Sequence, residues 1–220
     1  MKSTVVLASR MRRMAMLTVL CALFMISLPA FATVTIDFST GLAGVGGTYT
    51  LSGTNATGTN IPIGAVTISG APANNGVDLV TGTCAGTGPG GPFGCLNFNT
   101  AANTISITGG IPALGIANGT TLLTGSFSSF QASANGLTDA TGPDTKSAVL
   151  LTAVGLPTNT QFAFFGFSLT VNFNPSTGVG QITSTDMRND TVPEPSSVVL
   201  FGTMLFGVGA VVRRRFARNQ

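Results

Sequence analysis

Alternation of apolar and polar residues predicts β-strands along most of the chain. In the clearest stretch, 165–173, Phe, Phe, Leu, Val and Phe occupy the odd positions, and Gly, Ser, Thr and Asn the even ones. Side chains of a strand point alternately to opposite faces, so this period of two indicates a strand with one buried face. Phe162 and Phe164 are out of phase. Either a bulge near Phe164–Phe165 restores the apolar face, or the strand is buried on both faces.

Shorter segments follow the same rule, with Gly and Asn turns between them. The further segments expected to form strands are 34–38, 66–68, 105–107, 121–130 and 179–185. The run 148–154, which is apolar except for Thr152, is interpreted as a central strand, because such strands are covered on both faces. Short strands separated by turns predict an all-β domain, an antiparallel β-sandwich or jelly roll. Segments 54–60 and 85–94 are expected to be long, mobile loops.

Two terminal segments break this pattern, because they are continuously apolar and flanked by basic residues. At the N-terminus, Lys2 and three arginines precede the apolar stretch 14–28. Ala30-Phe31-Ala32 then supplies the small side chains that a signal peptidase requires. We predict a secretory signal peptide, 1–32, that is cleaved after Ala32, with an uncleaved anchor helix as the alternative.

The C-terminal apolar segment, 196–212, ends at three arginines, 213–215. As a helix it would be about 26 Å long, at the short limit for a bilayer core of about 30 Å. Arginines resist translocation, so we expect a transmembrane helix with its basic end in the cytoplasm. Pro195 lacks a backbone N–H and biases Glu194 toward an extended conformation, so the triplet 193–195 should be accessible at the outer membrane face.

This end of the chain resembles the PEP-CTERM sorting signal of Gram-negative bacteria. The matching residues are Val192-Pro193-Glu194-Pro195-Ser196-Ser197, an apolar helix with Gly202, Gly207 and Gly209, and Arg213-Arg214-Arg215. The resemblance implies transient insertion in the inner membrane and recognition by an exosortase, a processing enzyme with a cysteine nucleophile. It further implies removal of the tail and delivery to the cell surface or matrix, beside exopolysaccharide and biofilm. A proline stop before a plain anchor helix is the alternative.

The resemblance does not cover 33–191, so the chain divides into three parts. These are the signal peptide (1–32), an extracytoplasmic domain (33–191) and a sorting tail (192–220) with a basic end, 213–220. Within the middle part, Lys146 and Arg188 are the only basic residues and stand against six aspartates. That balance offers no basic face for nucleic acid, and no nucleic-acid partner is expected.

The composition also limits catalysis. The chain has no His, so a Ser-His-Asp or Cys-His arrangement is unavailable. Lys146 and Ser147 would point to opposite faces of a strand. The aspartates could pair as glycosidase carboxylates, but nothing in the sequence singles out a pair.

The remaining candidates for site chemistry are the aspartates and the cysteines. Asp139 with Asp144, or Asp186 with Asp190, could offer oxygens to calcium, but neither pair fits a complete calcium motif, and we expect no metal or other cofactor. Cys84 and Cys95 are the only cysteines left after signal removal. An exported compartment permits a disulfide, so we predict that these two cysteines are joined.

The sequence therefore predicts a surface or matrix protein without catalytic activity. Its expected partners are signal peptidase, exosortase, the inner membrane during sorting, and exopolysaccharide. A carbohydrate-binding module or a carboxylate-dependent glycan hydrolase is the alternative.

Overall fold

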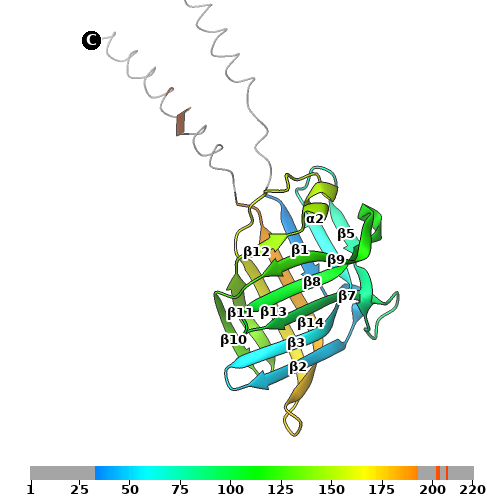
Figure 1. Cartoon of the computed structure of the whole chain (residues 1–220), viewed down its shortest axis with the longest axis vertical. Helices are drawn as coiled ribbons and strands as arrows, with labels where there is room; N and C mark the ends of the chain where they lie inside the picture. The colour runs from blue at the N-terminus through cyan, green and yellow to red at the C-terminus, as the bar shows by residue number, and fades with distance from the viewer. Residues whose placement is uncertain (1–32, 193–201, 204–206, 208–220) are drawn as a thin grey trace, which may run out of the picture. The chain divides into compact units, whose positions relative to one another are not determined.

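The computed structural model of the chain describes residues 33–192, 202–203 and 207 (Figure 1). The elements within 33–192 are β1 (Thr35–Ser39), η1 (Gly41–Ala43), β2 (Gly46–Ser52), β3 (Asn55–Ile63), β4 (Ala65–Ser69), β5 (Gly76–Leu79), β6 (Thr81–Cys84), β7 (Phe93–Asn99), β8 (Thr104–Ile111), η2 (Pro112–Leu114), β9 (Ile116–Gly125), β10 (Ser129–Ser133), β11 (Gly136–Gly142), β12 (Asp144–Lys146), α2 (Ala148–Ala153), β13 (Phe165–Asn174) and β14 (Val179–Asp190). Positions 202, 203 and 207 are helical.

The strands form one curled sheet. Its main path runs β10-β11-β13-β14-β2-β3-β7-β6-β8-β9-β12, and a branch of β1, β4 and β5 leaves it at β14. All strand pairs in the described part are antiparallel except β6 with β7. The predicted antiparallel all-β class is therefore confirmed, while its finer form, a sandwich or jelly roll, stays a prediction.

The curl brings the inner faces of distant strands together around aromatic side chains. Phe98 of β7 and Phe167 of β13 meet edge to face, with ring centroids 5.7 Å apart. Phe127 packs against Phe165 at 5.8 Å in the same manner. The Tyr49 hydroxyl donates to the carbonyls of Ser133 and Gly136, at 2.8 and 3.1 Å, and so ties β2 to the β10–β11 hairpin. Edge-to-face rings and a paired hydroxyl are favourable ways to bury aromatic residues.

The strand predicted at 165–173 is confirmed as β13. Its side chains alternate between buried and exposed from Phe165 to Asn172. The bulge predicted at Phe164 is wrong, and so is burial of both faces, because β13 begins at Phe165 and Phe164 is 61% exposed. The register shift lies further along, between Thr170 and Val171.

The run 148–154 is a helix, which corrects the prediction of a central strand. α2 begins after Ser147, whose hydroxyl accepts a hydrogen bond from the Leu150 amide at 3.2 Å. Leu150, Leu151 and Val154 are buried, whereas Val149 is 53% exposed. Buried positions spaced by one and four residues belong to one face of a helix, and Ser is a favoured N-cap.

The segment 54–60 belongs mainly to β3, which corrects the prediction of a mobile loop. Its backbone pairs with β2 on one side and β7 on the other. Gly58 is required there, because a Cβ at this position would clash with the Phe98 ring. The second expected loop connects β6 to β7 over 85–92, and its mobility stays a prediction.

The other predicted strands are present, with changed limits. Segment 121–130 divides between β9 and β10, whereas 34–38, 66–68, 105–107 and 179–185 lie in β1, β4, β8 and β14. No helix within the described residues is long and apolar enough to span a membrane. The predicted signal peptide, 1–32, and most of the predicted span, 196–212, lie outside those residues.

Candidate functional site

The first and last residues of the described domain lie side by side. β1 and β14 are antiparallel neighbours, with Thr35 opposite Asp190. The Val34 amide donates to Thr191 Oγ1 at 2.9 Å, and the Thr191 amide donates to the Val34 carbonyl at 2.8 Å. The domain therefore holds its two points of attachment, to the predicted signal peptide and to the predicted tail, at neighbouring positions.

The residues predicted to direct processing lie outside the described residues. They are Ala30 and Ala32 before the predicted signal cleavage, Pro193, Glu194 and Pro195 of the triplet, and Arg213, Arg214 and Arg215 of the membrane stop. Their roles stay predictions.

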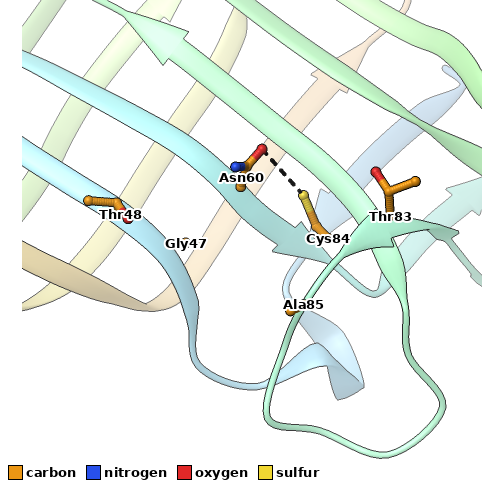
Figure 2. Close-up of a pocket in the computed structure, with 6 residues that line it drawn as sticks. All are labelled: Gly47, Thr48, Asn60, Thr83, Cys84 and Ala85. Carbon is orange, nitrogen blue, oxygen red and sulfur yellow. Dashed lines mark hydrogen bonds between the residues drawn. The ribbon is translucent and has the colours of Figure 1, made fainter.

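The predicted disulfide is confirmed, and a pocket lies beside it. Cys84 and Cys95 are bonded, with Cα atoms 5.3 Å apart, and join β6 to β7. The adjacent pocket has a volume of about 470 Å³ and is lined by Gly47, Thr48, Asn60, Thr83, Cys84 and Ala85 (Figure 2).

The chemistry of this pocket is polar and neutral. Figure 2 shows the Asn60 side chain directed at Cys84, with Oδ1 4.0 Å from the sulfur. This is a contact only, because a disulfide sulfur carries no proton to donate. The backbone amide of Asn60 donates to Asn97 Oδ1 at 2.9 Å, which holds this part of the pocket wall in place. The pocket lining has hydrogen-bonding groups but no carboxylate or amine for acid–base catalysis.

Two aspartates meet on the outward face of β1 and β14. Asp37 lies opposite Arg188, and Asp186 lies two pairs further along, opposite Ser39. Burial raises the pKa of Asp37 to about 7, assisted by a hydrogen bond to Asp186 and by its negative charge, and opposed by the Arg188 charge. Asp37 Oδ1 is buried and accepts no hydrogen bond from any described residue. A protonated Asp37 that donates a hydrogen bond to Asp186 accounts both for the raised pKa and for the absence of a donor to Oδ1.

Asp37 and Asp186 are a pair of neighbouring carboxyl groups, of the kind that the sequence left open as glycosidase carboxylates. The two aspartates do not line the pocket, whose lining contains no acidic residue. Asp186 is exposed on its strand. The pair can share a proton, but it does not line that pocket.

Two of the calcium candidates, Asp190 and Asp144, have other partners. Asp190 accepts hydrogen bonds from Thr35 and, at 3.4 Å, from Arg188. Asp144 is buried against Lys146. Within the described part of the chain, no three His, Cys, Asp or Glu side chains gather as metal ligands would.

The most buried polar cluster joins β12 to β14. The side chains of Lys146 and Asp144 are completely buried and form an ion pair. Lys146 Nζ donates to Asn189 Oδ1 at 2.9 Å and lies 4.5 Å from the centroid of the Phe162 ring. Asn189 Nδ2 donates to Asp144 Oδ1 at 2.9 Å and to the Ala163 carbonyl at 3.3 Å.

Burial shifts both charged groups of this cluster toward their neutral forms. It lowers the pKa of Lys146 to about 8, although the neighbouring Asp144 carboxylate opposes the shift. It raises the pKa of Asp144, against the charge of Lys146 and the hydrogen bonds from Lys146 and Asn189. The ionised pair and the neutral pair therefore lie closer in free energy than they would in water.

Sequence reasoning did not identify this cluster. Lys146 was considered only with Ser147, whose hydroxyl instead caps α2. One signal was present, because Asp144 and Lys146 are two residues apart and share a face of a strand. Nothing local marked Asn189, which is 43 residues further along the chain.

Comparisons with protein-family models, curated proteins and solved structures found no match. The functional assignment therefore follows from the residues of this chain.

Proposed function

We propose that this protein is exported, processed by an exosortase and delivered to the cell surface or extracellular matrix, where it acts without catalysis beside exopolysaccharide. The observation that carries the proposal is the order of residues at the C-terminus. The triplet Pro193-Glu194-Pro195 is followed by the apolar segment 196–212 and the arginines 213–215. A signal peptide at the other end would place the domain outside the cytoplasm.

The position of the chain ends supports this proposal. Val34 and Thr191 exchange hydrogen bonds, so a domain held by a signal peptide and then by a tail is attached from one end only. The Cys84–Cys95 disulfide suits an oxidising compartment outside the cytoplasm. We also propose that the curled sheet is a sandwich or jelly roll closed around its aromatic core.

The experiment replaces the triplet. With Pro193, Glu194 and Pro195 all changed to Ala, the apolar stop remains but the processing signal is lost. We expect the variant to accumulate at full tail length in the inner membrane, as measured by fractionation and intact mass. Changing the arginines 213–215 to Gln should instead weaken the membrane stop, because each arginine costs about 2.5–3.5 kcal/mol at the bilayer centre.

A proline elsewhere provides the control. Pro175 is exposed in the turn between β13 and β14, and its change to Ala should leave processing as in the parent. If the triple-Ala protein were trimmed and released like the parent, the triplet would be only a proline stop, and permanent anchoring would replace sorting.

A carbohydrate-binding module is the second candidate, and the neutral polar pocket favours it over a glycan hydrolase. Thr48, Asn60 and Thr83 offer donors and acceptors of the kind that sugar hydroxyls require. Binding of the purified protein to exopolysaccharide should weaken severalfold when Thr83 is changed to Val, which keeps the shape and removes the hydroxyl. Binding that persists unchanged in this variant, or depends on Asp37 and Asp186, would exclude this pocket as the binding site.

A further inference from the structure

We propose that Lys146 and Asn189 become joined by an intramolecular isopeptide bond, with Asp144 carrying the proton between the nitrogen that attacks and the nitrogen that leaves. This modification is independent of the sorting proposal. It requires an amine, a carboxamide and a carboxyl group in contact and away from water, and the cluster between β12 and β14 supplies all three.

The contacts place the amine, the carboxamide and the carboxyl group where the reaction needs them. Lys146 Nζ is 2.9 Å from Asn189 Oδ1 and so lies beside the carboxamide whose carbon it would attack. Asp144 touches both nitrogens, with Oδ2 on Lys146 Nζ and Oδ1 2.9 Å from Asn189 Nδ2. Reacting groups held in contact avoid most of the entropy cost of a bimolecular reaction.

Neighbouring groups fix the carboxamide and cover the amine. Asn189 Nδ2 also donates to the Ala163 carbonyl at 3.3 Å, so its amide is held from two sides. The Phe162 ring lies over the Lys146 amine at 4.5 Å. Asn189 is 1% exposed and Lys146 3% exposed, which keeps out the water that would solvate the ions.

Burial also makes the lysine a nucleophile. An ammonium has no lone pair, so the attacking form is the neutral amine, and burial lowers the pKa of Lys146 toward that form. Burial raises the pKa of Asp144, the group that receives the proton. Moving a proton from lysine to aspartate leaves two neutral groups, which an apolar site favours over an ion pair.

The bonds and protons balance without another reactant. Neutral Nζ attacks Cγ of Asn189, forming the C–N bond, and Oδ1 takes up the negative charge of the tetrahedral intermediate. Asp144 gives its proton to Nδ2 and takes one from Nζ; the Cγ–Nδ2 bond then breaks and ammonia leaves as the carbonyl re-forms. The proton that Asp144 took from Nζ then passes to the departing ammonia, which leaves as ammonium. Nothing is oxidised or reduced, and Asp144 returns to its carboxylate form.

The bond would join two strands that are not paired with each other through backbone hydrogen bonds. β12 pairs with β9 at one end of the main path, whereas β14 pairs with β13, β2 and β1. The closed loop would contain α2 and β13. β14 is also the strand that leads to the predicted tail, so the bond would fasten that strand to the rest of the domain (Figure 1).

The test is mass spectrometry of the purified protein, expressed as the full chain. Tryptic or chymotryptic mapping should find the peptide containing Lys146 linked to the peptide containing Asn189, with a mass lower by that of ammonia, about 17 Da. The Lys146→Met, Asn189→Ala and Asp144→Asn variants should show the two peptides unlinked. Their folding is checked by the Cys84–Cys95 disulfide and by circular dichroism.

Lys146→Met is the matched control for another source of ammonia loss. Asparagines before glycine, such as Asn118 and Asn135, can lose ammonia by cyclising on their own backbone, and this variant retains them. Equal loss of ammonia in the parent and in Lys146→Met, with no linked peptide in either, would overturn the proposal, as would unlinked Lys146 and Asn189 peptides from the folded parent. A link that forms as fast in Asp144→Asn would overturn the assigned role of Asp144.

Discussion

Asp37 shows what burial does to one charged residue of this domain. It lies on the face of β1 that carries polar side chains, yet its Oδ1 is buried and unpaired among the described residues. The neighbouring Asp186 adds like charge, and Arg188 compensates only in part. The folded domain therefore favours the protonated form of Asp37, although this side chain would be ionised in the unfolded chain at neutral pH.

The raised pKa of Asp37 predicts a specific dependence of stability on pH. The folded value is about 7 against 3.8 for the free side chain, so the folded state binds more protons between these limits. Stability should fall as pH rises from about 4 to about 7 and then level off. Because the side chain is partly exposed, the loss is expected to be on the order of 1 kcal/mol.

Urea unfolding at several pH values measures this effect. Asp37→Asn should make the decline shallower, because Asn does not ionise. Asp139→Asn changes an exposed aspartate and serves as the control that should unfold like the parent. A decline that is equally steep in Asp37→Asn would show that another group causes it.

At the scale of elements, the sequence correctly predicted those strands whose alternation of apolar and polar residues is visible among sequence neighbours. β13 was predictable because its period of two is set by neighbours in the sequence, and its burial follows the same period. α2 was predicted as a strand because a run that is apolar at all but one position shows neither the alternation of a strand nor the spacing of a helix. Its buried Leu150, Leu151 and Val154, with Ser147 as the N-cap, carried the correct signal.

The remaining elements depend on contacts that are distant in the sequence. Polar β3 is a strand because β2 and β7 pair with its backbone, and Gly58 leaves room for Phe98. The candidate site likewise depends in part on contacts between residues that are distant in the sequence. The disulfide was predictable from two cysteines in a chain that is predicted to be exported, whereas the Lys146–Asn189 contact requires β12 and β14 to be brought together by the fold.

At the scale of the whole domain, ties between distant strands determine which parts can separate. The disulfide closes the loop from Cys84 to Cys95, and the proposed isopeptide bond closes the loop from Lys146 to Asn189. The two loops share no residues. Hydrogen bonds between Val34 and Thr191 close the domain further at its attached end. A domain tied in this way suits exposure outside the cell, where an unfolded chain meets proteases without chaperones.

The last prediction is that the two covalent ties stabilise the domain independently. On chain-entropy grounds, the disulfide, with a sequence separation of 11, contributes about 3 kcal/mol, and a tie separated by 43 residues about 4 kcal/mol. Changing both cysteines to Ser removes the first tie. The paired change Asp144→Asn with Lys146→Met removes the second without leaving a lone buried charge, so chemical unfolding of both variants and their combination measures each contribution. The losses should add to within about 0.5 kcal/mol, because separate loops restrict separate parts of the unfolded chain. A combined loss well outside that sum would mean that the two ties act through shared structure in the core, and the picture of independent ties would have to be abandoned.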